Sequence, residues 1–218
     1  MVMQKVKAVG FDLDGTLYKS TPEMDDRIRV GFAWIIARDY PDQFPSVEKA
    51  REYFEGRYSE LQSGTAVLRE LGYESETADQ IRDSCLVNAD TLDLLRTDRD
   101  LAALIHNIQH MYVTYLLTSS PRELGIQKLE RLGIDSRFFE YAFYGDTFNG
   151  SKSSGEAFKY VLSVVGFTPG KHIYIGDRRK SDILPAKKLG MGTIAVWSEI
   201  PEADFSVPTI YDIEDLLL

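Results

Sequence analysis

The chain has little cysteine, little histidine and no long hydrophobic run. Cys85 is its only cysteine among 218 residues, which excludes an internal disulfide and a cysteine-based zinc knuckle. The apolar stretch before Asp12 is only a few residues long, too short for a membrane span, and it lacks a small-residue cleavage site. We therefore expect a cytoplasmic protein in a reducing compartment, with no membrane partner.

Positive charge is also scarce. The chain carries 25 Lys and Arg residues against 34 Asp and Glu residues, for a formal net charge of -9. This balance argues against broad binding of nucleic acid polymers or anionic membranes. A small anionic substrate remains compatible with it, because a metal ion can reverse the local field within one site. The composition says nothing of oligomeric state.

Short apolar runs bounded by turn residues predict a set of buried parallel strands. Between them lie helical patterns, so residues 111–218 alternate strand and helix. This alternation predicts an α/β fold with a doubly wound, Rossmann-like parallel sheet, whose ligands bind at the carboxyl ends of the strands. The predicted strands are 6–12, 111–118, 141–145, 171–176, 193–197 and, more weakly, 205–210.

The stretch from Asp14 to Thr118 is far longer than the roughly 30 residues of a simple strand–helix–strand unit. Its apolar periodicity predicts helices over 22–40, 47–61, 65–71, 76–88 and 99–109. We therefore predict an all-helical cap domain at 18–94, inserted after the first strand, and an α/β hydrolase core formed by 1–17 and 95–218.

Three helix starts can be read from capping residues. Ser120 precedes Pro121 and lies three positions before Glu123, which is the spacing of a capping box. Ser153 and Glu156 repeat that spacing. Asp182 precedes an apolar run and is either the cap of a third helix or an acidic ligand, two roles that are compatible.

The first predicted strand ends in a pair of aspartates. Asp12 and Asp14 are two positions apart, so in strand geometry they share a face at the open end of the strand. Gly15 then permits a tight turn. Two carboxylates this close repel each other unless a cation or a shared proton intervenes. This pattern predicts a metal site better than it predicts an ordinary acidic turn.

Residues 11–17, Phe-Asp-Leu-Asp-Gly-Thr-Leu, resemble the first motif of the haloacid dehalogenase-like hydrolases, most of which are Mg²⁺-dependent phosphatases. The segment ending in Thr118 and Ser119 resembles the second motif. Lys152 resembles the third, although Ser153 stands where the family often has proline. Residues 175–183, with Asp177 and Asp182, resemble the fourth. The four motifs occur in the family's order.

The resemblance implies Asp12 as a nucleophile that forms an aspartyl-phosphate, and Asp14 as the acid–base residue. It also implies Mg²⁺ held by Asp12, by the main-chain carbonyl of Asp14 and by Asp177, with Asp182 as a further acidic contact. Thr118, Ser119 and the following helix amides would bind phosphate, and Lys152 would direct a positive charge toward it.

We expect a phosphomonoesterase that acts on a small phosphorylated metabolite. Spacing in 58–72 is weakly similar to the cap of pyrimidine 5'-nucleotidase-like members, so a nucleoside 5'-monophosphate is one candidate substrate. A sugar phosphate or phosphoglycolate would also fit. The alternatives are a phosphomutase, a metal-independent 2-haloacid dehalogenase, which lacks an aspartate two positions after its nucleophile, and a non-enzymatic phospho-aspartate signalling domain, which lacks the helical insert.

Overall fold

The computed structural model describes residues 6–148 and 151–218. In this part of the chain six strands form one sheet in the order β3-β2-β1-β4-β5-β6, and every neighbouring pair is parallel. The prediction of a doubly wound α/β fold is therefore confirmed, and all six predicted strands are present. Their bounds are β1 (Ala8–Phe11), β2 (Val113–Leu117), β3 (Tyr141–Phe143), β4 (His172–Gly176), β5 (Gly192–Val196) and β6 (Phe205–Val207).

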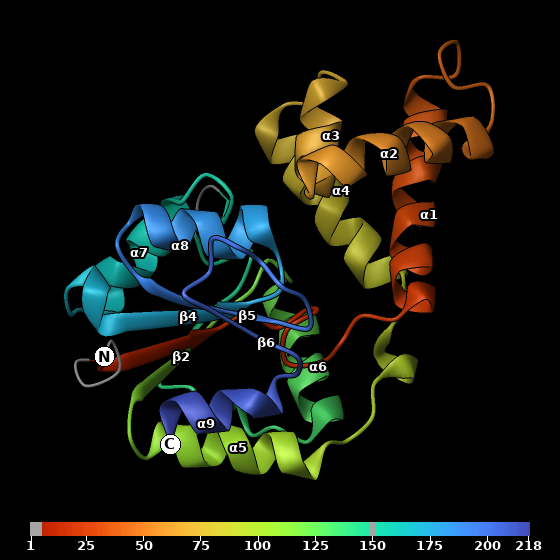
Figure 1. Cartoon of the computed structure of the whole chain (residues 1–218). Helices are drawn as coiled ribbons and strands as arrows, with labels where there is room; N and C mark the ends of the chain where they lie inside the picture. Colours follow the sequence, from red (N-terminus) through yellow and green to blue (C-terminus); the bar gives the residue numbers. More distant parts are fainter. Residues whose placement is uncertain (1–5, 149–150) are drawn as a thin grey trace. The chain divides into compact units, whose positions relative to one another are not determined.

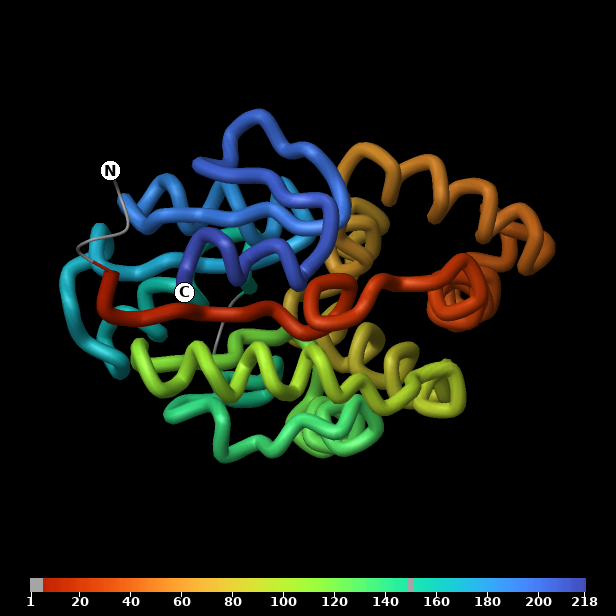
Figure 2. The backbone as a smooth tube through the Cα atoms, turned by 60° about the horizontal axis from the view of Figure 1, so that its bottom comes forward, coloured from red at the N-terminus to blue at the C-terminus, as the bar shows by residue number. Residues whose placement is uncertain are grey.

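Helices cover both faces of this sheet. Helices α7 and α8 lie on one face, and α5, α6 and α9 lie on the other (Figure 1). Figure 2 brings α5 and α9 in front of the strands. The bounds of these helices are α5 (Arg99–Gln109), α6 (Arg122–Leu132), α7 (Glu156–Val165), α8 (Leu184–Lys188) and α9 (Glu214–Leu217). Short turns of helix occur at η3 (Ser136–Phe138), η4 (Pro169–Lys171), η5 (Arg179–Ile183) and η6 (Tyr211–Ile213), of which η5 is π-helical.

The inner strands are buried on both sides because helices cover both faces of the sheet. All four residues of β1 and all five of β4 are buried. Gly10 in β1 leaves room for the ring of Tyr115 in β2, because a Cβ there would stand 2.2 Å from the ring. One core cluster joins Tyr115 and Tyr174 to Phe158 of α7. This packing holds the carboxyl ends of β1, β2 and β4 in fixed register.

The chain divides into two compact units. One is Ser20–Leu94, and the other joins the preceding residues to Leu95–Leu218. The first unit is helical, with a core of its own in which the ring of Phe54 stacks on those of Phe32 and Tyr58. Its elements are α1 (Pro22–Asp39), α2 (Val47–Leu61), α3 (Gly64–Glu70), α4 (Ser75–Asn88) and η2 (Leu92–Leu94). The assignment of 18–94 as a cap domain stays a prediction.

Two of the predicted helix starts are wrong. Helix α6 begins at Arg122 without a side-chain cap, because the hydroxyl of Ser120 hydrogen-bonds Asp14 instead of the helix amides. Helix α7 begins at Glu156 after Gly155, whose φ of 83° places it in the left-handed region, and Ser153 is not its cap. Among the described helices, none combines the length and apolar character needed to cross a membrane.

Candidate active site

The site lies where three neighbouring strands end. The first residue after β1 is Asp12, the first after β2 is Thr118, and the first after β4 is Asp177. These three strands are neighbours in the sheet. Parallel strands bring their carboxyl ends to one edge, so these three residues from distant parts of the sequence meet there. The amide of Asp12 donates to the carbonyl of Ile175 at 2.9 Å, which ties the first strand end to the fourth strand.

Lys152 supplies a buried positive charge beside Asp12. It follows β3 in the chain and is 4 % exposed. Its Nζ lies 2.7 Å from Asp12 Oδ1 and 2.5 Å from Asp182 Oδ1. The ammonium also stands 5.4 Å from the centre of the Tyr174 ring, a cation–π distance. Lys152 therefore joins the strand end of Asp12 to the π-helical turn η5.

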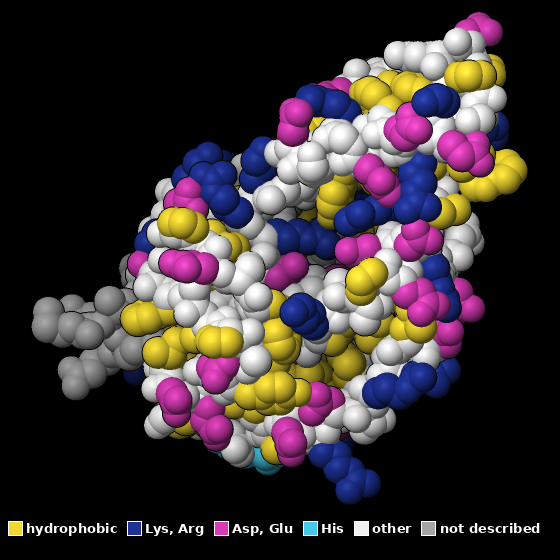
Figure 3. All heavy atoms as spheres, turned by 45° about the vertical axis from the view of Figure 1, so that its right-hand side comes forward, with side chains coloured by type: hydrophobic (Ala, Val, Ile, Leu, Met, Phe, Trp, Pro, Cys, Tyr) yellow, Lys and Arg dark blue, Asp and Glu magenta, His cyan; other side chains and the backbone are white. Residues whose placement is uncertain are grey.

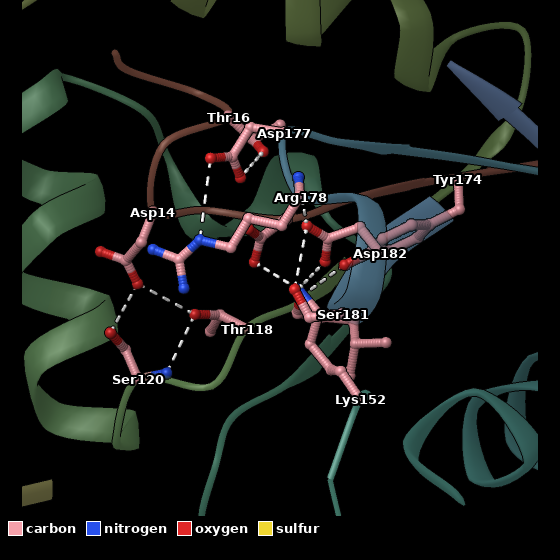
Figure 4. Close-up of polar contacts among 12 residues, drawn as sticks. Asp14, Thr16, Thr118, Ser120, Lys152, Tyr174, Asp177, Arg178, Ser181 and Asp182 are labelled. Atoms are coloured by element: carbon pink, nitrogen blue, oxygen red, sulfur yellow. Dashed lines mark hydrogen bonds and ion pairs between the residues drawn. The ribbon is translucent and has the colours of Figure 1, made fainter. Parts of the chain in front are cut away.

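Asp182 is fully buried in η5 and accepts a hydrogen bond from the backbone N–H of Arg178 at 3.0 Å. Gly176 permits this approach, because a Cβ there would stand 2.4 Å from Cβ of Asp182. Figure 4 shows Asp182 beside Lys152, and Asp177 beside Thr16 and Arg178. Of the two roles expected for Asp182, the structure places it in the acidic cluster; the cap role is wrong, because helix α8 begins without a side-chain cap.

Asp12, Asp177 and Asp182 form a group that fits a divalent cation. Each offers a carboxylate oxygen, and these oxygens lie within 4.8 Å of one another. Burial raises the pKa of Asp12 to about 7 although Lys152 opposes the shift, and Asp182 and Asp177 add repulsion. Burial likewise raises the pKa of Asp177 to about 6. A hard cation with oxygen ligands such as Mg²⁺ would relieve this repulsion.

Asp14 has a different environment from Asp12. Its side chain accepts hydrogen bonds from Tyr18, Lys128, Ser120 and Thr118, and it is not a member of the acidic cluster. Burial would raise the pKa of Asp14, but the Lys128 ammonium and the hydrogen bonds outweigh burial and hold it well below its usual range. The two aspartates of the first motif thus have opposite electrostatic surroundings. The main-chain carbonyl of Asp14 as a metal ligand stays a prediction.

The remaining predicted residues lie on the loop after β2. Thr118 is fully buried, and its hydroxyl accepts from the amide of Ser120 at 3.0 Å and donates to Asp14 at 3.3 Å. Ser119 is half-buried beside it. Both precede α6, and their role in phosphate binding stays a prediction.

Several site residues were missed by sequence reasoning. Lys128 and Tyr18 contact Asp14, and Thr16 donates to Asp177 Oδ1 at 3.3 Å. Trp197 donates its indole N–H to the Thr16 carbonyl at 3.1 Å from beyond β5. The sequence offered one signal for Lys128, which lies on the apolar side of a predicted helix. A buried lysine needs a charged partner, so a lysine on that side indicates a nearby carboxylate.

Comparison with known proteins agrees with this geometry. A family model described as haloacid dehalogenase-like hydrolase matches residues 6–190. The phosphoglycolate phosphatase of Vibrio vulnificus is 26 % identical over 216 residues, covering 90 % of this chain and 86 % of that protein. The glyceraldehyde 3-phosphate phosphatase of Methanocaldococcus jannaschii is 35 % identical over 95 residues, 42 % of this chain and 41 % of that one.

The solved structure of a haloacid dehalogenase-like family hydrolase from Streptococcus pneumoniae has the same fold. Its TM-score is 0.67 at 16 % identity, and the match covers 99 % of this chain and 100 % of that chain. The family model spans most of the chain and includes the ends of β1, β2 and β4. From these matches and from the arrangement of Asp12, Lys152, Asp177 and Asp182, we conclude that the chain belongs to the haloacid dehalogenase-like hydrolases.

Proposed function

We propose that this protein is a Mg²⁺-dependent phosphomonoesterase that acts on a small phosphorylated metabolite through an aspartyl-phosphate at Asp12. The observation that carries the proposal is the arrangement of Asp12, which is ion-paired to buried Lys152 and clustered with Asp177 and Asp182. Asp14 stands two positions on, with a separate set of hydrogen-bond donors. The names of the two phosphatases reported above support a phosphate ester as substrate.

The reaction would proceed in two displacements. A carboxylate oxygen of Asp12 attacks phosphorus, the bond between phosphorus and the ester oxygen breaks, and Asp14, in its protonated form, gives a proton to the leaving alkoxide. Water then attacks phosphorus, Asp14 takes a proton from it, and the bond between phosphorus and Asp12 breaks. Free phosphate and the original carboxylate are the products.

Lys152 orients the nucleophile in this scheme. Because its Nζ contacts Asp12 Oδ1, it holds one oxygen and leaves the other available for attack. Thr118, Ser119 and the amides of α6 would bind the phosphate oxygens. Mg²⁺, held by Asp12, Asp177 and Asp182, would neutralise charge on the phosphate and the carboxylates.

The proposed class of substrate rests on similarity to the two phosphatases described above. Phosphoglycolate and glyceraldehyde 3-phosphate are both short phosphate esters, which favours a small metabolite over a polymer. The nucleoside 5'-monophosphate suggested by 58–72 stays a prediction. A haloacid dehalogenase activity is disfavoured, because Asp14 follows the nucleophile by two positions and three carboxylates converge on the site.

The proposal is tested by phosphate release from a panel of phosphoglycolate, glyceraldehyde 3-phosphate, a sugar phosphate and a nucleoside 5'-monophosphate, with Mg²⁺ or with chelator. We expect turnover of at least one ester with Mg²⁺ and its loss with chelator. Asp12→Asn should abolish turnover and Asp177→Asn should raise the Mg²⁺ requirement. Asp135→Asn, a carboxylate paired with Arg137 on the surface, serves as the matched control.

The outcomes separate the alternatives. Chloride release from a 2-haloacid without metal would replace the phosphatase by a dehalogenase. Isomerisation of a sugar phosphate without net phosphate release would indicate a phosphomutase. A stable label on Asp12, with no turnover of any ester, would indicate a phospho-aspartate signalling domain.

A further inference from the structure

Helix α6 carries a lysine in the protein interior. Lys128 is 2 % exposed, although lysine is among the residues least often buried without a partner. Its Nζ lies 2.5 Å from Asp14 Oδ1 and 3.1 Å from the hydroxyl of Ser120. Taking an ammonium out of water costs several kcal/mol unless a close counter-charge compensates it. The position of Lys128 is therefore tied to Asp14.

The donors around Asp14 fill both of its oxygens. Oδ1 accepts from Lys128 and from the Tyr18 hydroxyl, each at 2.5 Å. Oδ2 accepts from Ser120 at 2.7 Å and from Thr118 at 3.3 Å. An ionised carboxylate has about four acceptor positions, so these four donors account for all of them. Both oxygens of the carboxylate are therefore held by donors.

The two oxygens differ in the kind of donor they face. The ammonium of Lys128 on Oδ1 can donate but not accept, whereas the hydroxyls, of Tyr18 on Oδ1 and of Ser120 and Thr118 on Oδ2, can do both. Oδ1 is therefore the anchored oxygen. Oδ2 faces hydroxyls only, which can turn to accept a hydrogen bond from a protonated carboxyl as well as donate one, so we assign proton exchange to Oδ2.

The site holds two separate lysine–aspartate pairs, each with a buried lysine. Lys152 contacts Asp12 and Asp182, and Lys128 contacts Asp14. The two lysines come from different elements, the segment after β3 and helix α6. Each aspartate of the first motif thus has its own cation, so a change in one pair leaves the contacts of the other in place.

We propose that Lys128 is the positioning residue of Asp14, with Tyr18 as its second anchor on the same oxygen. This proposal rests on the acid–base role of Asp14 in the proposed function. Lys128 does not contact the reacting atoms in this scheme. It sets the direction of the carboxyl group that, when protonated, gives its proton to the leaving group, and small misplacements of such a group cost large factors in rate.

The test uses the dependence on leaving group. An alkoxide needs a proton in order to leave, whereas 4-nitrophenolate leaves readily without one, so in the first displacement, which kcat/KM reports, only alkyl esters depend strongly on Asp14. In Lys128→Met we expect kcat/KM for the best alkyl phosphate of the panel to fall about 10²-fold, within the usual contribution of a general acid. We expect less than a tenfold fall with 4-nitrophenyl phosphate. Lys187→Met removes another lysine–aspartate pair, with Asp204 at 2.5 Å, and should change neither value.

Two further variants distinguish a loss of positioning from a loss of folding in Lys128→Met. Tyr18→Phe removes a donor from Oδ1 without unpairing a buried charge, and should shift the alkyl-to-aryl ratio in the same direction by a smaller factor. Lys128→Arg keeps the charge and should restore part of the ratio. Circular dichroism and thermal unfolding establish that each variant is folded.

The inference and the proposed function fail in different ways. Wild-type protein that hydrolyses none of the esters would overturn the proposed function. If wild-type protein is active, equal losses on both esters in folded Lys128→Met and Tyr18→Phe would show a structural role only and would overturn the inference. A rise in alkyl ester turnover would also overturn it, because it would mean that Lys128 restrains Asp14.

Discussion

Gly15 shows how closely the backbone approaches the acidic cluster. It lies in the left-handed region, with φ of 82°, and a Cβ at this position would stand 2.4 Å from Asp177 Oδ2. Glycine is therefore needed for two independent reasons, conformation and space. The first reason was predicted from the turn after Asp14. The second depends on β4 and was not visible in sequence.

Gly15→Ala and Gly166→Ala separate these two reasons. Gly166 also has a positive φ, 79°, but a Cβ there would meet nothing within 4 Å. We expect each substitution to lower the free energy of unfolding by about 1–3 kcal/mol, because a residue with a Cβ rarely adopts either backbone conformation. Gly15→Ala alone should also lower kcat/KM, by at least tenfold, because Asp177 must move. Denaturant unfolding and ester hydrolysis measure the two effects; equal activity in both variants would contradict the expectation.

Among the described helices, some begin after a side-chain cap and others do not. Helices α1, α2 and α3 begin after Thr21, Ser46 and Ser63, whose hydroxyls each accept an amide of the first turn. Helix α6 begins without such a cap, because Ser120 contacts Asp14. The local sequence predicts Ser120 as a helix cap, but its hydroxyl hydrogen-bonds a residue of the site instead. Local patterns predict an element well until a distant charged group competes for the same hydroxyl.

Helix α2 offers a matched pair of serine substitutions. Ser46→Ala removes the cap whose hydroxyl accepts from the Lys49 amide at 3.3 Å, and should cost about 1 kcal/mol of unfolding free energy. Ser59→Ala lies inside the same helix, where alanine is the better helix former, and should be neutral or slightly stabilising. Thermal or urea unfolding compares them. A loss of stability in Ser59→Ala as large as that in Ser46→Ala would count against the cap.

For the molecule as a whole, charge is spread more evenly than the net value suggests. Figure 3 shows acidic and basic side chains interspersed on the face in view. Within the helical unit Arg57 pairs with Glu60 and Glu70, and Arg27 pairs with Glu23 and Asp93. Exposed pairs of this kind each contribute at most about 1 kcal/mol. The stability of each unit therefore depends mainly on its own apolar core.

Two phenylalanine substitutions test whether the cores are separate. Phe54 is 1 % exposed in the helical unit and Phe158 is 0 % exposed in the sheet unit. Replacing either by alanine should cost about 3–5 kcal/mol. In hydrogen exchange of the full chain, Phe54→Ala should lower protection in 20–94 and spare the strands, and Phe158→Ala should do the reverse. Uniform loss of protection in both variants would show one cooperative unit.

Sequence alone was sufficient for the strands, the order of the motifs and the acidic pair after β1. Short apolar runs bounded by turn residues are typical of strands in a covered parallel sheet, and such a sheet brings strand ends together at one edge. The bounds of α2 and α5 also agree with the prediction, because their apolar spacing is local. These features depend on residues that are close in the chain or on a general rule of the fold.

Tertiary structure decided which charge stands beside which aspartate. Lys152 and Lys128 are separated in the chain from Asp12 and Asp14 by more than a hundred residues, and no local pattern pairs them. Packing of α6 against the sheet buries Lys128, and burial makes the choice of partner energetically decisive. The same burial gives Asp12 a pKa raised to about 7 and Asp14 a pKa held well below its usual range. Two aspartates that look alike in sequence thereby acquire different chemistry.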